Sequence, residues 1–114
     1  MLRKIVLLLG AFCVAPYIYA QNFLFPLDLR PPYLSANFGE LRPNHFHSGL
    51  DFKTDKVEGK VVRAVDSGYV SRVGITPGGY GRVLYVTHPN GYTSVYAHLK
   101  VLDSRVDSLV MAYQ

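Results

Sequence analysis

Residues 82–99 read RVLYVTHPNGYTSVYAHL, and this stretch decides the fold. Two runs rich in β-branched and aromatic residues, 82–88 and 92–99, flank Pro89-Asn90-Gly91. Runs of this composition are typical of β-strands. Proline presets φ at the start of a turn, and Asn-Gly supplies the left-handed positions that a tight hairpin needs. The stretch therefore predicts two antiparallel strands joined by a short turn.

On both sides of this hairpin the sequence predicts short elements separated by turn residues. Several short strands at regular spacing indicate an antiparallel all-β fold. The downstream apolar residues recur at helical intervals, and Asp103 is placed to cap that helix. The expected elements are a strand at 35–40 ending in a turn at Gly39, strands at 60–65 and 69–73 with a turn at 66–68, a glycine-rich loop at 76–81, and a helix over 103–113.

The sequence divides into three parts. Residues 1–20 resemble an export signal, because Arg3 and Lys4 precede an apolar run that is too short to span a membrane. Ala20 allows cleavage before Gln21, and an uncleaved anchor is the alternative. We therefore expect a secreted, periplasmic or cell-envelope protein of a bacterium with no stable membrane span after cleavage. Its only cysteine, Cys13, leaves with the signal.

Residues 21–34 form the second part, an extended lead-in, since its three prolines are incompatible with a regular helix. We expect four side chains of this segment to pack onto the domain: Phe23, Phe25, Leu27 and Tyr33. The third part, residues 35–114, is the folded domain. Without the signal its surplus is only about two positive charges, and the basic residues are scattered, so nucleic acid is not an expected partner.

The stretch 45–51, HFHSGLD, carries the densest set of chemically active residues. His47 and Asp51 are both good zinc donors, but on a straight strand positions i and i+4 lie about 13 Å apart. Both donors must come within about 2.0–2.2 Å of one zinc ion. The chain must therefore bend between them, and Gly49 is the residue that permits this through its tolerance of positive φ. The alternative is a hydrogen-bonded His–Asp pair without metal.

Four motifs together resemble the lysostaphin-type, or LytM-type, zinc metalloendopeptidases that act on peptidoglycan. The resemblance covers residues 35–99, and its motifs are His47-Ser48-Gly49-Leu50-Asp51, Gly59-x-x-Val62-x-Ala64-x-x-x-Gly68-x-Val70, Gly78-Gly79-Tyr80-Gly81 and Tyr96-Ala97-His98-Leu99. It implies a β-sandwich or barrel-sandwich hybrid and a Zn²⁺ ion held by His47 and Asp51. It also implies a catalytic His98 beside the zinc-bound water, and peptide cross-links of peptidoglycan as the substrate. Tyr80 and Gly81 are candidate walls of the substrate groove, whereas His45 and His88 are expected to be structural or surface residues.

The resemblance also implies a third zinc ligand from a later His-x-His motif, which this sequence does not contain. Catalytic zinc sites use three protein ligands and keep one open position. We therefore expect residues 35–114 to be an incomplete domain from the N-terminal part of a longer enzyme, and the polypeptide as given to be poorly active.

Two other functions remain open at this point. One is a non-catalytic LytM-type domain that binds the wall or activates an amidase; such domains often lose the ligands, which this sequence keeps. The other is a carrier domain of the biotinyl or lipoyl type, which would need a lysine at a hairpin tip where this sequence has Pro89-Asn90-Gly91.

Overall fold

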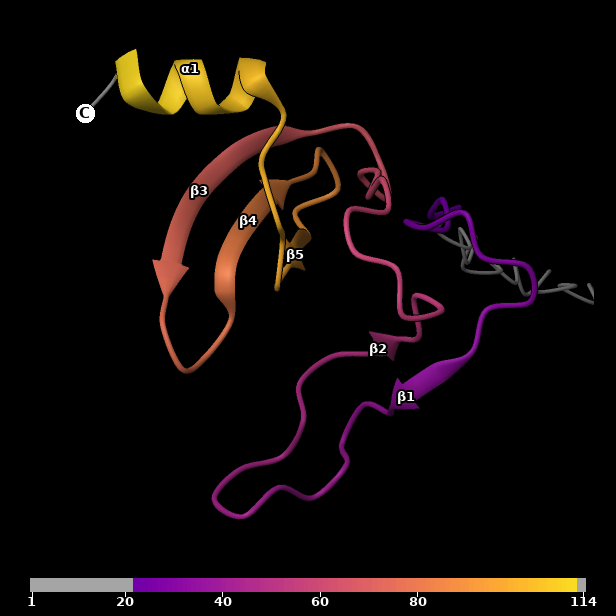
Figure 1. Cartoon of the computed structure of the whole chain (residues 1–114). Coiled ribbons are helices and arrows are strands. Elements are labelled where there is room, and N and C mark those ends of the chain that lie inside the picture. The colour runs from indigo at the N-terminus through magenta and orange to yellow at the C-terminus, as the bar shows by residue number, and fades with distance from the viewer. Residues whose placement is uncertain (1–21, 113–114) are drawn as a thin grey trace, which may run out of the picture.

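A computed structural model describes residues 22–112, in which antiparallel strands form two separate sheets followed by one helix (Figure 1). The expected signal sequence, residues 1–20, lies outside the described residues. Strands β1 (Leu34–Ala36) and β2 (Asp51–Phe52) form a two-stranded sheet. Strands β3 (Tyr69–Thr76), β4 (Gly81–Thr87) and β5 (Thr93–Tyr96) form a three-stranded sheet in the order β3-β4-β5. The all-β antiparallel prediction is confirmed.

The hairpin β4–β5 forms where the sequence predicts it. Leu84 pairs with Tyr96 and Thr87 with Thr93, while Gly91 at the turn has a left-handed φ of 85°. On the other side β4 pairs with β3 from Thr76–Gly81 to Tyr69–Thr87, with a bulge between Val70 and Arg72. Strand β3 extends three residues beyond its predicted C-terminal end, and β5 ends three residues before its predicted end, so His98 lies beyond the strand.

The strand predicted at 60–65 is wrong. Only Val62 makes a β-bridge, and its partner is Leu27 in the lead-in. The Arg63 N–H donates to the Pro26 carbonyl, and the Leu24 N–H donates to the Val65 carbonyl. Pro26 has no N–H to continue a ladder. The two segments therefore lie side by side with irregular pairing instead of forming a regular strand pair.

Aromatic residues of the lead-in contact the domain only in part. The Phe25 ring packs edge-on against Phe52, with 5.1 Å between ring centroids, and Phe23 lies near His88 and Tyr92. Tyr33, however, is 62% exposed, so its predicted packing onto the domain is wrong. The most buried apolar side chains are few and come from the lead-in, β1 and β4: Leu29, Ala36, Val83 and Val86.

A buried polar network ties the three-stranded sheet to the segment before it. His88 is 3% exposed, and its Nδ1 and Nε2 lie 2.8 Å from the Ser67 carbonyl oxygen and from Ser94 Oγ. Ser94 Oγ lies 2.9 Å from the Tyr96 hydroxyl, which accepts the Val65 N–H. Both nitrogens of His88 are hydrogen-bonded, which supports the structural role expected for this histidine.

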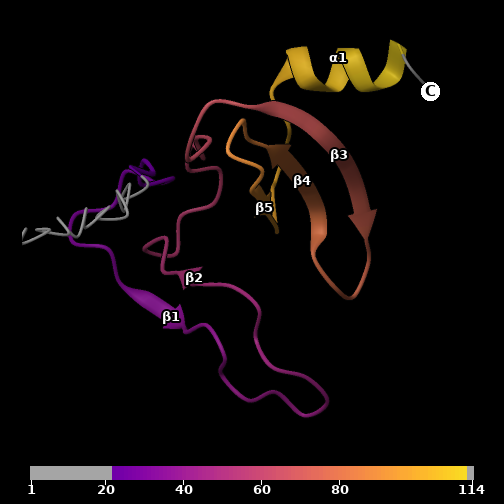
Figure 2. The same ribbon diagram turned by 180° about the vertical axis from the view of Figure 1, so that it is seen from behind.

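Helix α1 (Ser104–Ala112) matches the predicted helix within the described residues and lies beyond the end of the sheet at which β3 begins (Figures 1 and 2). Asp103 caps it: the Arg105 N–H donates to Asp103 Oδ1 at 3.0 Å, and the Arg105 guanidinium donates to both carboxylate oxygens. These bonds from the Arg105 side chain and backbone hold the pKa of the Asp103 carboxyl below its ordinary value.

We predict that α1 frays in acid because its cap is lost. A carboxyl whose pKa is lower in the folded state stabilises that state above its ordinary pKa, and the contribution disappears as the pH falls through the lowered value. Asp103→Asn should keep the cap and lose this pH dependence, whereas Asp103→Ala should fray the helix already at neutral pH. Cα chemical shifts of residues 104–112, followed down to about pH 2, would test this. Identical shifts in the wild type and Asp103→Ala at neutral pH would contradict it.

A second prediction concerns Gly68, which precedes β3. A Cβ at Gly68 would clash with the Thr87 carbonyl oxygen and would lie 2.9 Å from Val86 Cγ1. A Cβ at Gly74 would lie at an ordinary 3.4 Å from Val83 Cγ1. Gly68→Ala should therefore lower the free energy of unfolding by about 1–3 kcal/mol, as overpacking typically does. Gly74→Ala is the matched control and should change it much less. Denaturant titration of both variants measures the difference, and equal midpoints would refute the prediction.

Candidate metal centre

His47 and Asp51 converge as the sequence predicted. His47 Nε2 lies 3.3 Å from Asp51 Oδ1, and the two side chains are 18% and 44% exposed. Two donors that each lie about 2.0–2.2 Å from a tetrahedral ion are about 3.3–3.6 Å apart. The observed separation fits two ligands of one zinc ion and fits a direct His–Asp ion pair equally well.

A backbone carbonyl fixes the orientation of the His47 ring. Its Nδ1 lies 2.9 Å from the Asn37 carbonyl oxygen, which can only accept a hydrogen bond, so Nδ1 carries the proton. In the neutral ring Nε2 then presents a lone pair, and this lone pair faces the carboxylate oxygen of Asp51. Either a proton on Nε2 or a bound cation satisfies this arrangement. A backbone carbonyl that fixes the tautomer of a histidine is also the usual partner of a metal-binding imidazole.

Two local features bring these residues together. A short hairpin holds His47, since its N–H donates to the Glu40 carbonyl and its own carbonyl accepts the Gly39 N–H. The chain then bends at Gly49 before β2 pairs with β1, where Asp51 lies opposite Ala36. Gly49 does not use a left-handed φ, and a Cβ there would meet nothing within 4 Å. The bend is confirmed, but the positive φ expected of Gly49 is wrong.

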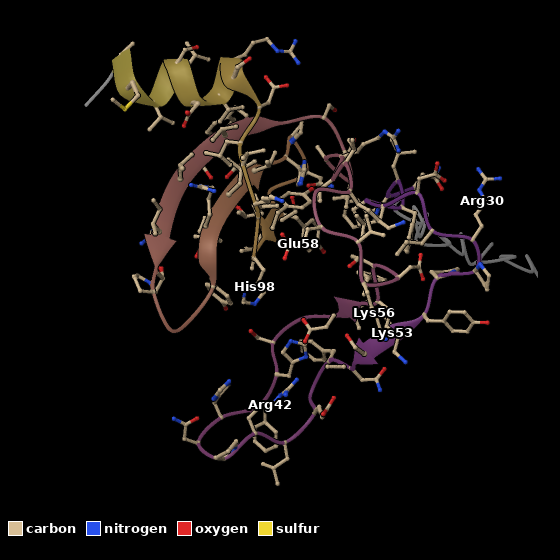
Figure 3. All side chains as sticks on the ribbon, viewed as in Figure 1. Arg30, Arg42, Lys53, Lys56, Glu58 and His98 are labelled. Carbon is tan, nitrogen blue, oxygen red and sulfur yellow. The ribbon has the colours of Figure 1, made fainter. Side chains whose placement is uncertain are left out.

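His98 lies at the end of the three-stranded sheet that faces the hairpin carrying Arg42 (Figure 3). It was expected on a strand, but β5 ends at Tyr96, and His98 has a left-handed φ of 57°. Such a φ is uncommon for residues other than glycine and is maintained only by its surroundings. Here the His98 N–H donates to the Tyr80 carbonyl at 2.8 Å, and the next N–H donates to the Arg82 carbonyl at 3.0 Å. The His98 side chain is exposed.

Tyr80 and Gly81 lie between the two halves of the candidate site. The Tyr80 hydroxyl is 3.4 Å from Ser48 Oγ, next to His47, while the Tyr80 carbonyl binds the His98 backbone. Tyr80 is 45% exposed, so its ring is available at the surface. Gly81 has a φ of 61° and would place a Cβ 3.7 Å from His98 Nδ1. Residue 80 therefore contacts both the His47–Asp51 segment and His98.

Within residues 22–112 no cluster of three or more His, Cys, Asp or Glu side chains could hold a metal ion. The candidate centre thus has two donors, and His45 does not add a third: its Nδ1 is bonded to the Asn44 side chain at 2.6 Å. Sequence reasoning missed the roles of Asn37 and Arg42. Asn37 acts through its backbone carbonyl, which leaves no signature in the residue type. Arg42 Nη2 lies 3.7 Å from Asp51 Oδ2, and the spacing of these two residues along the sequence did not predict the contact.

The two glycines of the site predict opposite results on substitution. Gly49→Ala should be accepted, since its φ is ordinary and its surroundings are open. Gly81→Ala should cost about 1–2 kcal/mol, because a Cβ disfavours the left-handed region. It should also shift the backbone NMR signals of His98, whose N–H is held by the neighbouring Tyr80. Denaturation curves together with ¹H–¹⁵N spectra would test both, and a larger loss of stability in Gly49→Ala would contradict the assignment of the bend.

In the described part of the chain, no helix combines the length and the apolar character needed to cross a membrane.

Comparison with known proteins gives a consistent result. The chain is 29% identical over 90 residues to proteins named DD-carboxypeptidase/endopeptidase Mpg from Neisseria meningitidis serogroup B and Neisseria gonorrhoeae. The match covers 79% of this chain but only 19% of each relative, so the chain spans about a fifth of their length. No solved structure matches it. The profile of peptidase family M23 matches residues 45–114, which begin just before the candidate metal ligands. The chain therefore belongs to peptidase family M23.

Proposed function

We propose that this chain carries part of the active site of a zinc endopeptidase that hydrolyses the peptide cross-links of bacterial peptidoglycan. The family and the names of the Neisseria relatives support a peptidase that acts on peptidoglycan. The single observation that carries the zinc assignment is the 3.3 Å approach of His47 Nε2 to Asp51 Oδ1 with the Nδ1 proton directed at Asn37. We place the protein in the cell envelope or outside the cell, in keeping with the export signal expected at residues 1–20.

In this proposal His47 and Asp51 hold the metal through one nitrogen and one carboxylate oxygen. The bound zinc would lower the pKa of a water molecule toward neutrality and polarise the scissile carbonyl. Such a site would need a third protein ligand, and residues 22–112 hold no group of three His, Cys, Asp or Glu donors. Asp51 would supply a single negative charge, so a zinc site there would stay net positive and would favour developing negative charge on the substrate.

His98 is proposed to handle the proton. Its exposed ring can accept a proton from the attacking water or donate a hydrogen bond to the oxyanion of the tetrahedral intermediate. The left-handed backbone at His98 restricts the position of its Cβ and therefore of its ring. The His98 and Leu99 N–H groups donate to the carbonyls of Tyr80 and Arg82, which holds this backbone in place. Tyr80 and Gly81 would form one wall of the groove that admits the peptide.

The alternative function is a non-catalytic domain that binds the wall or activates an amidase. Such a domain has no need of the His47 tautomer, of the short His47–Asp51 distance or of a restrained His98. A carrier domain remains the least supported function, since the hairpin tip is Pro89-Asn90-Gly91 and presents no lysine. These observations favour the peptidase.

The test uses the protein expressed from its complete gene. His47→Ala should abolish release of cross-link fragments from purified peptidoglycan and weaken zinc binding by more than about 100-fold, since even outer partners of a metal ligand are worth about 10–100-fold. His45→Ala is the matched control, because the His45 side chain is exposed and is hydrogen-bonded to the side chain of its neighbour Asn44. Chromatography of the fragments and competition with a zinc chelator measure the two effects. Undiminished cleavage in His47→Ala would exclude the proposal.

A further inference from the structure

The hydroxyl of Tyr96 joins the end of β5 to the segment that precedes β3. Its oxygen accepts the Val65 N–H at 2.8 Å and the Ser94 hydroxyl at 2.9 Å. Ser94 Oγ in turn lies 2.8 Å from Nε2 of the buried His88. Tyr96 is itself half-buried, so water competes for these hydrogen bonds only in part. The phenol therefore anchors the last residue of β5 to a segment that lies far from it in the sequence.

Tyr96 is also the last residue of the sheet before His98. It pairs with Leu84 of β4, and β5 ends there. His98 follows two positions later with its left-handed φ of 57°, and its N–H donates to the Tyr80 carbonyl. Figure 3 shows the His98 side chain at this end of the sheet. The backbone of His98 is thus held from two directions, by Tyr80 through a hydrogen bond and by the anchored Tyr96 through Ala97.

We infer that Tyr96 is a positioning residue that holds His98 in its left-handed conformation. A residue other than glycine keeps this conformation only where its surroundings impose it. The two hydrogen bonds fix the phenol of Tyr96, and only Ala97 separates its backbone from His98. Without the hydroxyl, the Val65 N–H and the Ser94 hydroxyl lose their acceptor, and the end of β5 shifts to find other partners. The catalytic consequence rests on the proposed function, in which His98 handles the proton.

The experiment compares Tyr96→Phe with the wild type in the protein expressed from its complete gene. Labelling with ¹⁵N-histidine makes the His98 backbone amide visible by NMR, and its signal is identified by its loss in His98→Gln. Tyr96→Phe should shift or broaden this signal. It should also lower kcat for cleavage of soluble cross-linked peptidoglycan fragments about ten-fold with little change in KM, because a displaced acid–base group loses part of a contribution of about 10²–10⁴-fold.

Two controls separate positioning from a general loss of structure. Tyr92→Phe makes the same chemical change on the same hairpin, where Tyr92 is 57% exposed and its ring contacts Phe23. Asp103→Ala removes the cap of α1, which lies beyond the opposite end of the sheet (Figure 1). Both variants should keep the His98 amide signal and kcat of the wild type.

An unchanged His98 amide signal or an unchanged kcat in folded Tyr96→Phe would overturn the inference and leave the proposed function standing. Full activity of His98→Gln would instead overturn the role proposed for His98, whatever Tyr96→Phe shows. If Tyr96→Phe does not fold, Ser94→Ala decides, because it removes one of the two hydrogen bonds to the Tyr96 oxygen. A His98 amide signal at the wild-type position in Ser94→Ala would then overturn the inference.

Discussion

The candidate site depends on one hydrogen bond, from His47 Nδ1 to the carbonyl oxygen of Asn37. This bond assigns the proton of the imidazole to one nitrogen and leaves the other as a lone-pair donor toward Asp51. Without it the ring could turn, or could place its proton on Nε2 and bind Asp51 as an ordinary hydrogen-bonded pair. The position of the Nδ1 proton of His47 is therefore set by a backbone group ten residues earlier in the chain.

The short strands β1 and β2 also contribute to the orientation of His47. Asn37 directly follows β1, and Asp51 begins β2, so the pairing of the two strands sets the distance between the carbonyl that orients His47 and the carboxylate that faces it. A two-stranded ribbon of this length is not stable alone. Two interactions support it: the Phe25 ring packs on Phe52 of β2, and the lead-in pairs with residues 62–65. The lead-in thus supports the His47–Asp51 pair from a distance.

The sequence predicted the elements that are defined by local chemistry. Pro89-Asn90-Gly91 determines a hairpin and Asp103 caps a helix, because in both cases the backbone conformation and hydrogen bonds depend on residues close in the sequence. The prediction failed where a distant partner decides the outcome. Residues 60–65 have the composition of a strand, but Pro26 in the segment beside them interrupts the ladder. Likewise His98 lies beyond the end of β5, because the Tyr80 and Arg82 carbonyls accept the N–H groups of His98 and Leu99. The spacing of residues within 92–99 does not predict these hydrogen bonds.

The candidate site was predictable to a different degree. We predicted that His47 and Asp51 converge because two donors must reach one ion, and this convergence required a bend at Gly49. The φ of Gly49 was predicted wrongly. Tyr80 was expected to line a substrate groove, but its contacts with Ser48 and with the His98 backbone were not predicted. The division of the Asp51 oxygens between His47 and Arg42 could not be predicted, since it depends on the direction of a carboxylate that two separate turns control.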